Sequence, residues 1–138
     1  MMRTKRFLLV FVMSAFAAIF SFGAAAQDDG YGVFVPIAKY IEEGDADKLS
    51  AWFADSMEIS VVYGSGNSSR KQATQILKNF FNRNKPSSFV IEHKASRSSM
   101  KYALGSLVAG GEKFDVTIFV SIKDGDYKIQ QLKIEKVL

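Results

Sequence analysis

The 138-residue sequence contains no cysteine, a single histidine and two prolines. Without cysteine the chain has no disulfide, no thiol nucleophile and no sulfur ligand for a metal. One histidine, His93, is too few for the usual zinc or iron ligand sets. The sequence also lacks a P-loop, a dinucleotide-binding glycine fingerprint and a G-x-S-x-G nucleophile motif. We therefore expect no metal and no cofactor, and a fold held together by packing alone.

The N-terminus has the three regions of a secretory signal peptide. Basic residues lie within positions 3–6, an apolar run broken only by two serines covers residues 7–22, and three consecutive alanines end at Ala26. The run is shorter than the ~20 residues of a membrane-spanning helix, and no cysteine follows it to carry a lipid anchor. We expect residues 1–26 to be cleaved off before Gln27. The protein would then be exported to the periplasm or the extracellular space, with membrane contact only through the uncleaved signal.

Removal of this segment changes the net charge. It holds three of the 18 basic residues and none of the 14 acidic ones, so residues 27–138 carry a net charge of +1. Residues 28–58 are acidic overall and residues 70–101 are basic. That asymmetry fits a polar partner, self-association or two solvated faces. With no internal repeat and no long linker, residues 27–138 are predicted to form a single domain.

Three helices are predicted before Pro86. Gly44 is placed to end the first helix, and Asp45 is placed to cap the second. The spacing of Ser69 and Gln72 predicts a capping box at the start of the third. The apolar stripes expected on the three helices are Phe34, Ile37, Ala38 and Ile41; Ala46, Leu49, Trp52 and Phe53; and Ala73, Ile76, Leu77, Phe80 and Phe81.

Strand signals, in which apolar and polar residues alternate, occupy the rest of the chain. The predicted strands cover residues 57–63, the stretch after Pro86 that contains 89–95, and residues 101–109, 113–122 and 127–137. In the last one the alternation slips, so we expect a β-bulge near Gln130-Gln131. The order helix, helix, strand, helix and four strands predicts an α+β fold in which a curved antiparallel sheet packs on the helices.

Four strings of this chain carry a resemblance to known proteins. They are residues 41–50 (IEEGDADKLS), 77–81 (LKNFF), 101–105 (KYALG) and 129–134 (IQQLKI). In these strings the chain resembles a family of uncharacterised exported proteins of Bacteroidetes, domain of unknown function 4783, in the nuclear-transport-factor-2-like superfamily. The resemblance implies a cone-like, cystatin-like fold with a cavity between sheet and helices. It implies no particular chemistry, because fold does not determine function.

The candidate site is a ligand-binding wall on the predicted strands. His93 shares the face of its strand with Phe89 and Ile91, which suggests that it points toward the core or a cavity. Tyr102 lies on the next strand, and a hairpin would place it close to His93. Together with Trp52, these residues would form an apolar pocket with a few polar groups. His93 and Tyr102 also have a structural interpretation, as core side chains whose polar atoms are satisfied.

Three functions stay open from the sequence. The first is a non-catalytic module that binds a small apolar or amphipathic ligand, or a protein partner. The second is an isomerase-, cyclase- or hydrolase-type enzyme that uses His93 and Tyr102 as acid–base groups. The third is a homodimerisation module with an apolar outer sheet face that includes Phe119. The strand carboxylates Glu58, Glu92 and Asp115 alternate opposite the apolar face, which argues against a buried catalytic base. Nucleic acid is not an expected partner, because the phenylalanines of the basic stretch belong to core stripes.

Overall fold

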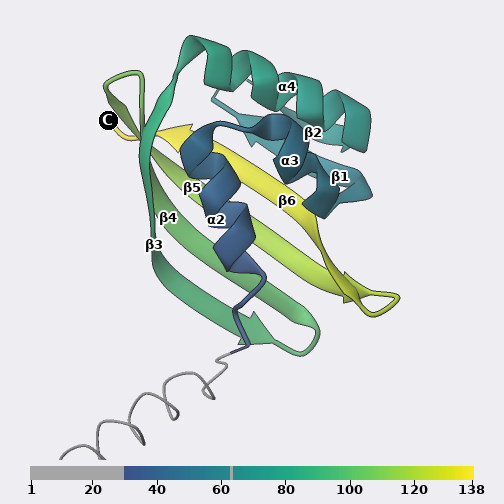
Figure 1. Ribbon diagram of the computed structural model, residues 1–138. Helices are drawn as coiled ribbons and strands as arrows, with labels where there is room; N and C mark the ends of the chain where they lie inside the picture. The colour runs from purple at the N-terminus through teal and green to yellow at the C-terminus, as the bar shows by residue number, and fades with distance from the viewer. Residues whose placement is uncertain (1–29, 63) are drawn as a thin grey trace, which may run out of the picture. The chain divides into compact units, whose positions relative to one another are not determined.

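The computed structural model describes residues 30–62 and 64–138 (Figure 1). The predicted signal peptide and Tyr63 lie outside the described residues, and Tyr31–Leu138 form one compact unit. Its elements are α2 (Phe34–Glu43), α3 (Ala46–Leu49), the 3-10 turn η1 (Ser50–Trp52), β1 (Phe53–Val61), β2 (Gly64–Ser69), α4 (Arg70–Arg83), β3 (Pro86–Arg97), β4 (Met100–Ala109), β5 (Glu112–Lys123) and β6 (Asp126–Lys136).

The strands form one six-stranded sheet in the order β2-β1-β6-β5-β4-β3. The last strand, β6, returns beside the first and runs parallel to it. All other neighbouring strands are antiparallel. The sheet is therefore mixed, whereas the sequence predicted an antiparallel one. It also contains a strand, β2, where the sequence indicated only a break. Gly and Asn disfavour strands intrinsically, but this segment pairs with β1 without interruption, from Ser56–Ser69 to Val61–Gly64.

The predicted helix caps are confirmed, but the second helix is shorter than predicted. It ends at Leu49, so Trp52 lies in η1 and Phe53 begins β1. Gly44 ends α2 in the left-handed conformation, at φ 69°. The Lys48 amide donates to Asp45 Oδ1 at 3.0 Å, which caps α3. Ser69 and Gln72 form the expected capping box at the start of α4. The predicted apolar stripes are buried, apart from a half-buried Ala38 and Trp52 and an exposed Ile76.

Two β-bulges decide which side chains of the candidate site face the helices; a further register shift lies at the start of β3, between Pro86 and Ser88. One lies at Gln130, between the pairs Phe119–Gln131 and Val120–Ile129, as predicted. The other lies in β3 and was not predicted. There Ile91 pairs with Gly105 and His93 pairs with Leu104, so Glu92 is the extra residue. An extra residue turns the following side chains to the other face. His93 therefore lies opposite Phe89 and Ile91, and its predicted placement on the core face is wrong.

The two faces of the sheet have different environments. The helices α2, α3 and α4 all lie on one face, which we call the inner face (Figure 1). Every buried side chain in the described part of the chain is apolar, and these side chains form one continuous cluster between helices and sheet. We call the opposite face the outer face; no described helix covers it (Figure 1). Within residues 30–62 and 64–138 no helix is long and apolar enough to cross a membrane.

Candidate functional site: the outer face of the sheet

The outer face carries an exposed apolar strip along β4. Met100, Tyr102 and Leu104 occupy successive outward positions of this strand, and their exposed fractions are 36%, 41% and 43%. Phe119 pairs with Tyr102 across β4 and β5, and the two rings stack with centroids 5.9 Å apart. We call Met100, Tyr102, Leu104 and Phe119 the outer apolar strip. Apolar side chains that gather on one solvent-exposed face are typical of interaction surfaces.

A polar depression of about 370 Å³ adjoins this strip. His93, Leu104, Thr117 and Lys133 form a row across four strands in it, because each is the register partner of the next. A second row contains Glu92, Ser106, Asp115 and Glu135. The surface therefore has the composition of a binding patch, with an apolar centre beside a hydrogen-bonding rim.

Hydrogen bonds and an ion pair hold the rim in place. The Ser106 hydroxyl donates to Glu92 Oε1, and Lys133 Nζ lies 2.6 Å from Glu135 Oε1. The hydrogen bond and the negative charge of Glu135 raise the pKa of Lys133 above its ordinary value, with a smaller contribution from Glu58. All of these groups stay in contact with solvent, so the rim is available to a partner.

His93 and Tyr102 do share this face, but they do not form a pocket with the other predicted site residues. Both side chains are exposed. His93 pairs with Leu104 while Tyr102 pairs with Ala95, so they are offset by one row of the sheet. Glu58, Glu92 and Asp115 are exposed too, as predicted. No imidazole or carboxylate is buried among the described residues.

Phe89 and Ile91 lie on the inner face, in a groove of about 370 Å³ between α2 and β3. Tyr31 and Phe34 line the same groove, and their rings stack with centroids 6.3 Å apart. Lys94 lies at its rim, with Nζ 5.3 Å from the centroid of the Tyr31 ring. The groove is apolar at its base and cationic at its edge.

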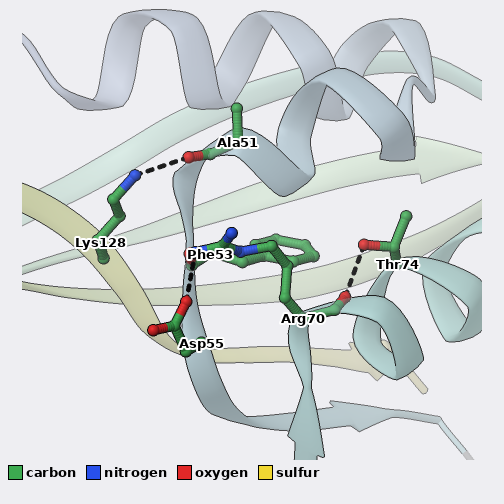
Figure 2. A network of polar contacts seen from close by, with 6 residues as sticks. All are labelled: Ala51, Phe53, Asp55, Arg70, Thr74 and Lys128. Carbon is green, nitrogen blue, oxygen red and sulfur yellow. Dashed lines mark hydrogen bonds and ion pairs between the residues drawn. The ribbon is translucent and has the colours of Figure 1, made fainter.

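Trp52 lies apart from both surfaces, half-buried in the η1 turn that leads into β1. Polar contacts fix this turn and the start of α4, as Figure 2 shows. The Arg70 guanidinium donates through Nε to the Phe53 carbonyl at 3.2 Å and through Nη2 to Asp55 Oδ1 at 2.8 Å. Thr74 Oγ1 donates to the Arg70 carbonyl at 2.7 Å. Arg70 thus ties α4 to β1.

A charged depression of about 410 Å³ lies next to Arg70. It forms because β1 and β6 do not pair between Phe53 and Glu58, which leaves an opening beside the Gln130 bulge. Lys128 crosses it and donates to the Ala51 carbonyl at 2.9 Å (Figure 2). Its charged lining residues are Arg70, Lys123, Lys128, Asp55, Asp124 and Asp126. Among the described residues no three acidic or histidine side chains are placed to hold a metal ion, and the mixed charges neutralise one another.

Of the outer apolar strip, the sequence pointed to Tyr102 as a site residue and to Phe119 as part of an apolar outer face, but it missed Met100, because the predicted strand began at residue 101. The structure places Tyr102, Leu104 and Ser106 on one face of β4, and Phe119 lies opposite the core face of β5, as the sequence predicted. The sequence missed that His93 belongs with them, because residues 92–95 contain no apolar alternation that would reveal the bulge at Glu92.

A curved mixed sheet with helices on one face is the fold of the nuclear-transport-factor-2-like class of α+β proteins. A protein of this class and of unknown function from Cytophaga hutchinsonii superposes with a TM-score of 0.59 at 7% identity, covering 81% of this chain and 93% of that one. Residues 34–135 match the family model described as domain of unknown function DUF4783, and the chain belongs to this family.

Solved structures of the same family are similar over nearly their whole length. A DUF4783 protein from Bacteroides ovatus has a TM-score of 0.72 and 25% identity, covering 75% of this chain and 94% of its own. A member from Bacteroides fragilis has a TM-score of 0.71 and 23% identity, covering 75% and 97%. The comparison with curated proteins finds no match.

Proposed function

We propose that this chain is a non-catalytic binding module of the bacterial cell envelope that engages a protein through the outer face of its sheet. The observation that carries the proposal is the outer apolar strip, which no described element covers. Its three exposed side chains stand beside a half-buried Phe119 and a polar rim. Aromatic side chains at the centre of such a patch contribute most of the binding energy in many interfaces.

Site-specific photo-crosslinking tests this interface. A photoreactive residue replaces Leu104, and the matched control replaces Val137, an apolar side chain after the end of β6 that has the same exposed fraction, 43%. After irradiation in the host, we expect an adduct at position 104 and none at position 137. The substitution Tyr102→Lys should suppress the adduct, because it places a charge in the apolar strip. An equal yield at both positions would contradict the proposal.

The mass of the adduct identifies what is bound. An adduct with a different protein supports a binding module. An adduct with the mass of two copies of this chain supports the alternative, a homodimerisation module. Sedimentation of the purified protein provides an independent measurement. A monomer at high concentration excludes the homodimer.

Export is the second part of the proposal, and it rests on the N-terminal pattern of charge, apolar run and small residues. Cell fractionation followed by N-terminal sequencing tests it. We expect mature protein that begins at Gln27 in the envelope or culture-medium fraction. Protein that keeps Met1 in the cytoplasmic fraction would contradict it.

A second candidate function is the binding of a small amphipathic ligand in the groove between α2 and β3. It is favoured by Phe89 and Ile91 at the base of this groove and Lys94 at its rim, since apolar pockets with few polar groups are typical of ligand sites. Native mass spectrometry of protein purified from its own host tests it. A bound mass that the groove-filling variant Ala38→Phe loses supports the ligand, and a clean apo mass contradicts it.

A further inference from the structure

The two edges of the sheet are protected very differently. Unpaired edge strands invite pairing with other chains, and proteins usually protect them with charge, proline or bulges. The β3 edge has all three, because it begins at Pro86, contains Lys94 and Arg97, and is interrupted by the bulge at Glu92. The β2 edge has none. Its sequence GSGNSS carries no charge and no proline, and its register with β1 is unbroken.

The backbone N–H and C=O groups of alternate β2 residues point away from the sheet. The Val62 amide donates to the Ile134 carbonyl of β6 at 2.9 Å. Because backbone groups alternate along a strand, the N–H and C=O groups of even-numbered residues at this end of β1 point toward β6, and those of odd-numbered residues point toward β2. Their partners on β2 are residues 64, 66 and 68. The amides and carbonyls of Ser65 and Asn67 therefore point outward, and both residues are exposed.

An apolar slot of about 480 Å³ lies beside this edge. Ile59 and Val61 of β1 and Ile76 of α4 line it, and Ile76 is 38% exposed. The slot is open because its lining on β2 includes Gly64 and Gly66. A Cβ added at either glycine would contact nothing within 4 Å.

The charge of α4 indicates what kind of strand fits this edge. The helix has four basic residues and no acidic one. Lys78 pairs with Asp47 and Arg70 pairs with Asp55, whereas Lys71 and Arg83 form no ion pair within the described residues. Lys71 is the second residue of α4, two positions after the end of β2, and Arg83 lies seven positions after Ile76, on the same side of the helix. Acidic side chains are the complement of this surface.

A second copy of this chain fits the edge poorly. Pairing of β2 with β2 would bring two basic α4 helices together, which costs energy through like-charge repulsion. The second copy would also present only Gly, Ser and Asn to the slot, so the apolar surface of Ile76 would stay unfilled.

From these four features we infer that β2 accepts an extended segment of another protein as a seventh strand. The segment pairs its backbone with Ser65 and Asn67, inserts an apolar side chain over Gly66 against Ile76, and carries acidic residues at its ends. Main-chain pairing supplies affinity in this mode of recognition, and the slot and the charge supply specificity. The site is separate from the outer apolar strip and does not depend on it.

Peptide binding to the purified full chain tests the inference. The probe is a capped synthetic peptide with an Ile-Thr-Ile-Thr centre and aspartates at both ends, and its counterpart has lysines at both ends. Fluorescence anisotropy should show the aspartate peptide binding about tenfold more tightly than the lysine peptide. Hydrogen exchange of the Ser65 and Asn67 amides should slow when the aspartate peptide is bound. Failure of the aspartate peptide to bind, or equal affinity of both, overturns the inference.

Variants at two positions separate edge pairing from other contacts. Asn67→Pro removes the outward amide without breaking the ladder to β1, and Gly66→Ile fills the slot; each should weaken binding about tenfold or more. Asn67→Ala keeps the amide and should bind like the unmodified chain. If Asn67→Pro binds the peptide as tightly as the unmodified chain, the inference is overturned. It is also overturned if the unmodified chain forms a dimer that Asn67→Pro dissociates, because β2 would then pair with a second copy of this chain. The crosslink at position 104 should survive Asn67→Pro, so the two proposals can fail separately.

Discussion

Tyr102 and Phe119 stack across β4 and β5 with their ring planes inclined by 29°. The pair lies on the face of the sheet that no described helix covers. Each ring limits the rotation of the other, so the aromatic surface is already ordered before a partner arrives. Preorganised aromatic groups lose little conformational entropy on binding.

The aromatic pair should show measurable coupling in the folded protein. We expect the double variant Tyr102→Ala/Phe119→Ala to differ from the sum of the single variants by about 0.5–1 kcal/mol in the free energy of unfolding, as cross-strand aromatic pairs do. Urea titrations of the four proteins measure this. Strict additivity would mean that the rings pack independently.

Gly105→Ala should destabilise the fold by about 1–3 kcal/mol, the usual cost of overpacking a core. Its Cβ would lie 2.7 Å from Phe89 Cε1 and 2.8 Å from the Val90 carbonyl oxygen. Thermal or urea unfolding measures the loss. The matched control is Gly66→Ala, whose Cβ has open space, and a comparable loss there would contradict the steric explanation.

Arg70→Met should destabilise the fold more than Asp55→Asn. Arg70 donates to a backbone carbonyl as well as to Asp55, and loss of that contact costs about 1 kcal/mol. The Asp55 side chain is 96% exposed, so its ion pair contributes less than about 0.5 kcal/mol. Urea unfolding of both variants tests the order. The reverse order would identify the ion pair as the dominant contact.

Glu135→Gln should lower the pKa of Lys133 toward its ordinary value of 10.5, because Glu135 is the main cause of the rise. A raised folded-state pKa adds stability that is fully present below the unfolded-state pKa and is lost as the pH rises through the folded-state value. The stability difference between the two proteins should therefore be constant near neutral pH and shrink in the alkaline range. Side-chain NMR titration of Lys133 checks the first point and urea unfolding at several pH values checks the second. An unchanged Lys133 pKa would contradict the pairing.

Local features of the fold could be predicted because they depend on neighbouring residues. The Asp45 cap and the capping box of Ser69 and Gln72 are satisfied within three residues along the chain. The bulge at Gln130 was visible because the apolar alternation on both sides of it is strong. The candidate site was harder to predict, since the polar segment that contains His93 has no such alternation.

By itself, the sequence determined the helix caps, the strand alternation and the α+β class, because capping and periodicity act over a few residues. It also contains the N-terminal pattern from which we propose export. The tertiary structure decided which face His93 occupies, because one extra residue at Glu92 reverses every side chain that follows it. It also decided that GSGNSS is a strand, because pairing with β1 overrides the weak strand propensity of these residues. Both decisions depend on contacts with other strands, and together they define the two surfaces on which binding is proposed.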